Sequence, residues 1–108
     1  MLMVIPFAQN FQNKKIIKIG NLQFLLIHRF FDESGRIFPS VEKHLTKKFN
    51  AIIYGHTHVH DLRNGNHNTV FFNPGSPTLP RRGTEPSVGT LTIFDNDLFN
   101  FQLHFLKK

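Results

Sequence analysis

The sequence predicts an α/β domain that consists mostly of strands, with one or two helices. Short apolar runs, each bounded by turn residues, recur along the chain, which is typical of strands. Residues 22–27 and 50–54 are almost entirely apolar, as expected for strands that are buried on both faces of a sheet. A chain of 108 residues can bury a modest core, so we expect one domain.

The first predicted elements are a hairpin and a helix. Residues 15–19 and 22–27 flank Gly20-Asn21, a pair that favours a tight turn. After a polar loop, apolar residues recur at helical spacing, which predicts a short amphipathic helix at residues 41–48. So few helices leave part of the sheet uncovered, although sheets of this kind normally have both faces covered.

The rest of the chain predicts further strands and one long loop. A buried strand at residues 50–54 is followed by a turn signal and a second strand at residues 69–72. Four prolines and two glycines make residues 73–86 an irregular loop. Residues 88–94 and 99–106 then form a final hairpin.

Composition and charge exclude several function classes. The net charge is +6, but the basic residues are scattered in pairs without interleaved aromatic residues, so we expect a solvated surface and no nucleic-acid partner. The absence of cysteine excludes disulfides, thiolate metal sites and cysteine nucleophiles. No apolar run approaches the roughly 20 residues of a membrane span, and the start lacks the basic region of a signal peptide. We therefore expect a cytoplasmic protein with no membrane partner.

Three histidines alternate directly after the strand at residues 50–54. In an extended chain, His56, His58 and His60 would point to one face. Imidazole is a common ligand of divalent metals, so this spacing fits a metal site. It fits a solvated, histidine-rich strand end equally well, and spacing alone does not decide between the two.

Three motifs together resemble a known family. A strand ending at His28, Gly-His-Thr-His at residues 55–58 and Asn-Pro-Gly-Ser at residues 73–76 occur in this order. The arrangement resembles the C-terminal half of the calcineurin-like metallophosphoesterases, in their small bacterial and archaeal phosphodiesterase branch, which shares its fold with a retromer subunit. The resemblance implies a four-layer α/β/β/α sandwich, of which residues 1–108 would be a single, incomplete domain.

The resemblance also implies a metal site and a substrate class. His28 and His56 would bind one divalent metal and His58 a second, with manganese, zinc, iron or nickel as candidates. Two such metals hold a phosphoester and activate a hydroxide for its hydrolysis. His60 lies beyond the motif, and Asp61 could orient one of the histidines.

The loop formed by Asn-Pro-Gly-Ser and the residues after it completes the implied site. Asn73, Gly75 and Ser76 would either contact the phosphoester or hold a tight turn, and both interpretations remain open. Arg81 could meet a phosphate, whereas a surface role is favoured for Arg82.

The chain departs from the family pattern in two respects. It contains no Asp-x-His or Gly-Asp, and Gly-Asn-His at residues 65–67 follows Gly-His-Thr-His instead of preceding it. Arg29 replaces the glycine expected after His28, and its charge would discourage cation binding. We therefore assign no catalytic residue, and we expect the chain to be inactive alone. Activity would require the missing N-terminal half or self-association through an exposed sheet, and the alternative is a non-catalytic protein-interaction scaffold.

Overall fold

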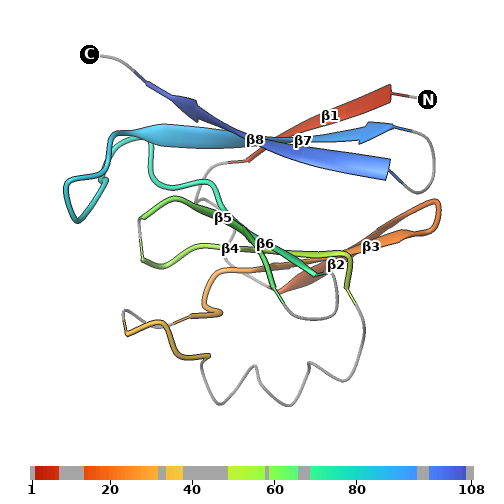
Figure 1. Cartoon of the computed structure of the whole chain (residues 1–108), viewed down its shortest axis with the longest axis horizontal. Coiled ribbons are helices and arrows are strands. Elements are labelled where there is room, and N and C mark those ends of the chain that lie inside the picture. The colour runs from red at the N-terminus through yellow and green to blue at the C-terminus, as the bar shows by residue number, and fades with distance from the viewer. Residues whose placement is uncertain are drawn as a thin grey trace.

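The strands of the protein form two sheets (Figure 1). The computed structural model describes residues 2–7, 14–31, 34–37, 49–57, 59–65, 69–94 and 98–106. The strands in this part are β1 (Leu2–Phe7), β2 (Lys15–Ile19), β3 (Leu22–Ile27), β4 (Ala51–Tyr54), β5 (Asp61–Asn64), β6 (Val70–Asn73), β7 (Ser87–Phe94) and β8 (Leu98–Phe105). The helix predicted at residues 41–48 lies outside the described residues.

The two sheets differ in strand direction. The smaller sheet has the order β1-β7-β8 and is antiparallel throughout. The larger sheet has the order β2-β3-β4-β6-β5, in which β3, β4 and β6 run parallel and the edge strands β2 and β5 run antiparallel to their neighbours. The carboxyl ends of the three parallel strands therefore meet at one edge of this sheet.

The two predicted hairpins are present as β2–β3 and β7–β8, and the two predicted strands between them are present as β4 and β6. In β2 and β3, Ile19 pairs with Leu22 across a turn in which Gly20 has a φ of 58°. This left-handed conformation costs glycine nothing and most other residues about 1–2 kcal/mol. β7 and β8 pair along their whole length, as predicted. In the described part of the proline-rich loop after β6 there is no strand.

Strand β1 was not predicted. It pairs antiparallel with β7, with Leu2 opposite Phe94 and Phe7 opposite Gly89. Its partner lies more than 80 residues away in the sequence, so no local turn signal announces the pairing. The apolar start of the chain therefore completes the smaller sheet.

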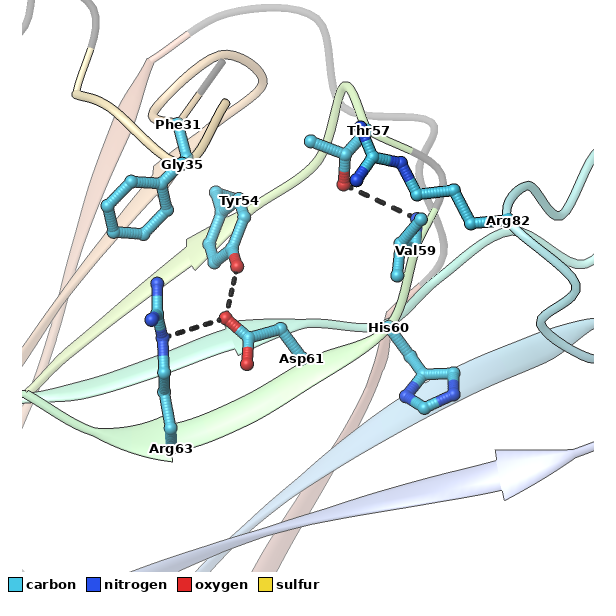
Figure 2. A pocket seen from close by; sticks show the side chains of 9 residues that line it. All are labelled: Phe31, Gly35, Tyr54, Thr57, Val59, His60, Asp61, Arg63 and Arg82. Atoms are coloured by element: carbon cyan, nitrogen blue, oxygen red, sulfur yellow. Dashed lines mark hydrogen bonds and ion pairs between the residues drawn. The ribbon is translucent and has the colours of Figure 1, made fainter. Parts of the chain in front are cut away.

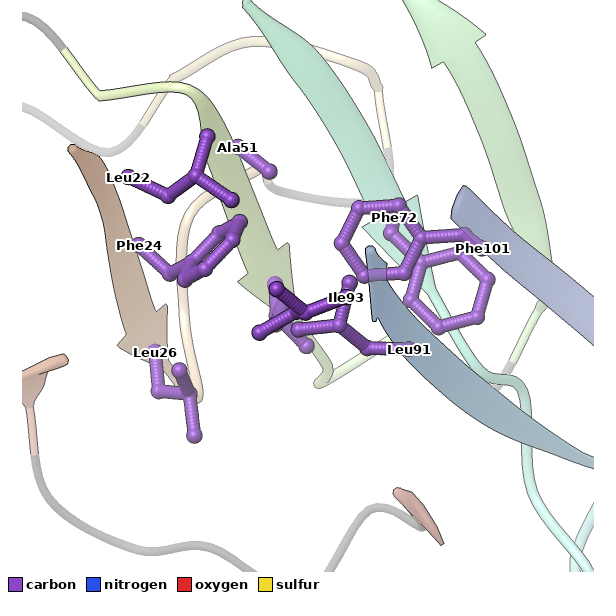
Figure 3. Packing of buried hydrophobic residues seen from close by; sticks show 9 residues of the cluster. Leu22, Phe24, Leu26, Ala51, Phe72, Leu91, Ile93 and Phe101 are labelled. Carbon is purple, nitrogen blue, oxygen red and sulfur yellow. The ribbon is translucent and has the colours of Figure 1, made fainter. Parts of the chain in front are cut away.

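The main core lies between the two sheets (Figure 3). The β3 side chains Leu22, Phe24 and Leu26 face this space, and Leu91 and Ile93 of β7 enter it from the other sheet. The rings of Phe72 and Phe101 stack across the interface at a centroid distance of 4.4 Å. Burying each such side chain contributes roughly 1.5–3 kcal/mol, so this interface holds the two sheets together.

A second apolar cluster covers the opposite face of the larger sheet. It includes Leu25 and Ile52 from the strands and Phe30, Phe31 and Phe49 from the segments beside them. β3 and β4 are thus buried on both faces, as their continuous apolar sequences predict. The prediction of a sheet-rich α/β fold, a portion of a layered sandwich, is confirmed.

Candidate functional site

The parallel strands bring two of the predicted metal ligands together. His28 follows the last residue of β3, and His56 follows β4 after one intervening glycine. The amide of Gly55 donates a hydrogen bond to the carbonyl of His28 at 3.0 Å, which ties the two strand ends. The imidazole rings lie edge to face with centroids 5.8 Å apart. His58, the third predicted ligand, lies outside the described residues.

The backbone at His56 is strained. Its φ is 75°, in the left-handed region, and the amide of Thr57 donates to the carbonyl of Gly55 at 2.9 Å. These features describe a three-residue γ-turn centred on His56, a form that is rare because it costs conformational energy. The residue in the left-handed conformation is the histidine itself and not the preceding glycine, Gly55. Strain of this kind persists where surrounding contacts enforce it, often at functional sites.

Asn73 supplies those surrounding contacts. It is the last residue of β6, and its side chain is fully buried. Its Nδ2 donates to Thr57 Oγ1 at 3.1 Å and lies 3.5 Å from the Gly55 carbonyl, while its Oδ1 accepts from the amide of Gly75 at 3.0 Å. Asn73 therefore joins the histidine turn to the loop that follows β6.

The other predicted loop residues hold that loop against the smaller sheet. Gly75 has a φ of 76°, and a Cβ at this position would lie 2.0 Å from Ser87 Oγ, so the close approach requires glycine. Ser76 is buried, and its Oγ accepts from the amide of Leu79 at 2.8 Å. The hydroxyl of Ser87 donates to the Pro74 carbonyl at 2.8 Å. These contacts favour the tight-turn interpretation of Gly75 and Ser76.

Arg81 and Arg82 lie at a turn of the loop that follows β6. Both are exposed, and the Arg81 carbonyl accepts from the Thr84 amide at 3.0 Å, which closes a turn. Arg82, for which we expected a surface role, lines a cavity next to the histidine turn (Figure 2). Arg29 is also exposed, so water screens its charge near His28.

Sequence reasoning missed a polar cluster beside this edge. The Tyr54 hydroxyl donates to the Asp61 carboxylate, and Asp61 Oδ2 lies 3.0 Å from Arg63 Nε (Figure 2). Burial raises the pKa of Tyr54 well above its usual value, and the hydrogen bond to the Asp61 carboxylate raises it further. Asp61 could orient a histidine, and among the described residues it contacts Tyr54 and Arg63. The sequence feature that could have indicated this cluster is the spacing of Asp61 and Arg63, an acidic and a basic residue two positions apart, which lie on one face of an extended strand.

His60 points toward the smaller sheet (Figure 2). Its ring packs edge to face on Phe105 with centroids 5.1 Å apart. This contact stabilises the junction between the sheets and does not direct the imidazole toward His28 or His56.

The donor set fits one metal better than a bridged pair. Two imidazoles on one tetrahedral metal, bound at about 2.1 Å, have centroids roughly 5 Å apart, close to the distance between the His28 and His56 rings. Their nitrogen donors suit zinc, iron or nickel, whereas manganese prefers oxygen ligands. Within the described ranges, no group of three histidine or carboxylate side chains converges on one point. A bridged pair therefore needs donors beyond the described side chains.

Comparison with known proteins now places the chain in a family. A family model described as the calcineurin-like phosphoesterase superfamily domain matches residues 4–96. The chain belongs to this superfamily. No curated protein matches it. In the described residues of this superfamily member, no helix is long and apolar enough to cross a membrane.

Solved structures share the calcineurin-like fold at low identity. A predicted phosphoesterase from Streptococcus pneumoniae has a TM-score of 0.69 at 22% identity, over 92% of this chain and 57% of the other. Vps29 from Entamoeba histolytica, in a complex with Zn²⁺, has a TM-score of 0.64 at 22% identity, with the same coverage of 92% and 57%. YfcE, a phosphoesterase from E. coli, has a TM-score of 0.51 at 23% identity, over 82% and 43%. The matched part of this chain thus covers between 43% and 57% of the length of these three structures.

Proposed function

We propose that this chain contributes the histidine ligands of a metal-dependent phosphoester hydrolase. The observation that carries the proposal is the strained turn at His56, which Asn73 fixes beside His28. A fold that needed only a strand connection would not place a histidine in a costly backbone conformation at this edge. Membership of the calcineurin-like superfamily supports a phosphoester as the substrate class.

The proposal assigns roles to the histidines and leaves other donors to be supplied. His28 and His56 would hold one divalent metal through neutral imidazole nitrogens, and His58 would hold a second. When bound, such metals neutralise phosphate charge and activate water as a nucleophile. This chain's own part is to fix the imidazoles. β3 and β4 are rigid parallel strands, and Asn73 holds the turn at His56 that follows β4.

We further propose that residues 1–108 form one incomplete phosphoesterase domain. The sequence holds no Asp-x-His and no Gly-Asp, the motifs that bring carboxylate ligands in the family it resembles. A metal pair held by imidazoles alone lacks the negative charge that balances it. We therefore expect hydrolysis only when a further segment or another chain adds carboxylates to this edge.

A non-catalytic scaffold is the second candidate. Arg29 favours it only weakly, because a cation directly after His28 opposes metal binding but water screens the charge of this exposed side chain. Two of the structural neighbours named above carry a phosphoesterase description and one is Vps29, so neighbours alone do not choose between the candidates. Metal affinity separates them, since the scaffold needs no metal.

Zinc binding measured by equilibrium dialysis tests the proposal. We expect about one zinc per chain, lost in His28→Ala and in His56→Ala. His104→Ala is the matched control, because this exposed histidine of β8 bonds Thr90 Oγ1 through Nε2 at 2.9 Å, away from the candidate ligands. Zinc binding that is absent, or indifferent to both site variants, would favour the scaffold.

Hydrolysis of bis(4-nitrophenyl) phosphate tests the second part of the proposal. We expect no metal-dependent turnover from the 108-residue chain alone. Turnover by a monomeric chain that disappears in His56→Ala would contradict incompleteness, whereas turnover by an assembled form alone would mean that a second copy completes the site.

A further inference from the structure

Strand β8 forms an open edge of the smaller sheet. In the part of the chain that the structure describes, β8 pairs with β7 on one side and with no strand on the other. The amide of Leu106, directly after β8, donates to the Pro86 carbonyl on the β7 side at 2.8 Å. Because backbone groups alternate in direction along a strand, those of the odd-numbered residues of β8 point to the open side. The edge therefore presents a row of donors and acceptors to another strand.

β8 is the least protected edge of the two described sheets. Edge strands usually carry charged residues or proline, which discourage pairing with another chain. The other edge strands have such residues: Lys15 and Lys18 in β2, Asp61 and Arg63 in β5, and Pro6 in β1. β8 has the sequence LFNFQLHF, which contains no proline and no lysine, arginine, aspartate or glutamate. Its whole length is therefore open to pairing.

Apolar side chains at both ends of this edge are exposed to solvent. Leu98 is 60% exposed at the start of β8, and Phe105 and Leu106 are 45% and 41% exposed at its end. Since both ends are apolar and the strand between them is uncharged, the edge is complementary to itself in the reversed direction. A second copy of the chain that runs antiparallel fits these features better than a charged peptide does.

One antiparallel register matches side chains along the whole edge. Centred on Gln102, which then lies opposite its own copy, it pairs apolar residues with apolar ones and polar residues with polar ones. The pairs are Leu98 with Leu106, Phe99 with Phe105, Asn100 with His104 and Phe101 with Leu103. A shift by one residue would place apolar side chains opposite polar ones, and it would set the open backbone groups of one copy against groups that face β7. A shift by two would place Leu98 opposite His104 and leave Leu106 unmatched.

We propose that the chain forms a two-fold symmetric dimer in which β8 pairs antiparallel with β8 of a second copy, in the register centred on Gln102. The smaller sheets of the two copies then join into one continuous sheet. A contact through one strand pair is small, so the dimer should dissociate on dilution. The inference goes beyond the proposed function because it requires neither a metal nor hydrolysis. The EDTA-treated chain and His56→Ala should dimerise as the parent chain does, so each proposal can fail without the other.

Cysteine cross-linking tests both the edge and its register, because the parent chain has no cysteine. Residue 102 and its copy would form a non-hydrogen-bonded pair with Cα atoms about 4.5 Å apart, within the range of a disulfide. With oxidised glutathione as the oxidant, we expect Gln102→Cys to form a disulfide-linked dimer roughly ten-fold or more faster than Asn100→Cys. Asn100 lies on the same face of β8, but four residues, or about 13 Å, would separate it from its own copy along the strand. A mixture of Asn100→Cys and His104→Cys should cross-link between the two variants, since these residues would lie opposite each other.

Sedimentation velocity of charge variants tests the dimer without cross-links. Gln102→Lys would place two cations side by side at the two-fold axis, so we expect it to shift the parent dimer to monomer. Thr92→Lys adds the same charge to the same face of the sheet, on central strand β7, and should sediment as the parent chain does. A monomeric parent chain, or a dimer that Gln102→Lys leaves unchanged, would overturn the proposal. Equal cross-linking of Gln102→Cys and Asn100→Cys would overturn it as well. Circular dichroism of each variant checks that its fold is retained.

Discussion

Replacing Asn73 by leucine tests how the strained histidine turn is held. The change keeps the number and branching of the side-chain heavy atoms but replaces both polar atoms by methyl groups, at a position that is 0% exposed. The Gly75 amide loses its acceptor at 3.0 Å, and Thr57 Oγ1 loses its donor at 3.1 Å. An unsatisfied buried group costs about 1–3 kcal/mol and a lost hydrogen bond about 1 kcal/mol, so we expect the free energy of unfolding to fall by about 2–4 kcal/mol.

Urea unfolding monitored by circular dichroism measures this loss of stability. Asn100→Leu is the matched control, because Asn100 is exposed on β8 and the same change there should alter stability by less than about 0.5 kcal/mol. Asn73→Asp keeps the acceptor for Gly75 and should fall between the two. A loss in Asn73→Leu that is no larger than in the control would refute the claim that Asn73 secures the turn.

Three further predictions concern pH, packing and association. Tyr54 is the single tyrosine of the sequence and has a raised pKa, so its contribution to stability is complete below pH ~10 and is lost as pH rises above that value. Tyr54→Phe should remove this alkaline loss of stability in urea titrations. A tyrosinate absorbance titration near pH 10 in the folded chain, as for an ordinary tyrosine, would contradict the prediction. Gly89→Ala should lower stability by about 1–3 kcal/mol, because the new Cβ would lie 2.3 Å from Phe72 Cζ; an unchanged urea midpoint would show that the rings can yield. Edge strands β2 and β5 expose Ile16 by 38% and Leu62 by 44%, so sedimentation velocity should detect a dimer or larger assembly, and a monodisperse monomer would count against it.

Local sequence signals were sufficient for most of the larger sheet. The β2–β3 hairpin, β4 and β6 each combine an apolar run with a neighbouring turn signal, and the structure has all of them. Since β3 and β4 are parallel, the positions of His28 and His56 directly after them were enough to expect their meeting. The identity of these strand-end residues carried both the family assignment and the candidate site.

What could not be predicted depends on pairing between distant segments. β1 joins the smaller sheet only through β7, which no local pattern encodes. The Tyr54–Asp61 contact depends on β6 lying between β4 and β5, because this order brings the start of β5 near the end of β4. The role of Asn73 likewise depends on β6 ending beside the histidine turn, so its sequence motif suggested substrate contact and tight turn equally.

The central claim is that His28 and His56 together form a metal-binding edge. X-ray diffraction at the zinc absorption edge, on crystals of the zinc-loaded chain, tests it directly. We expect an anomalous difference peak about 2.1 Å from one imidazole nitrogen of each residue. A peak confined to His104 or His60, with none between the two strand-end histidines, would contradict the claim.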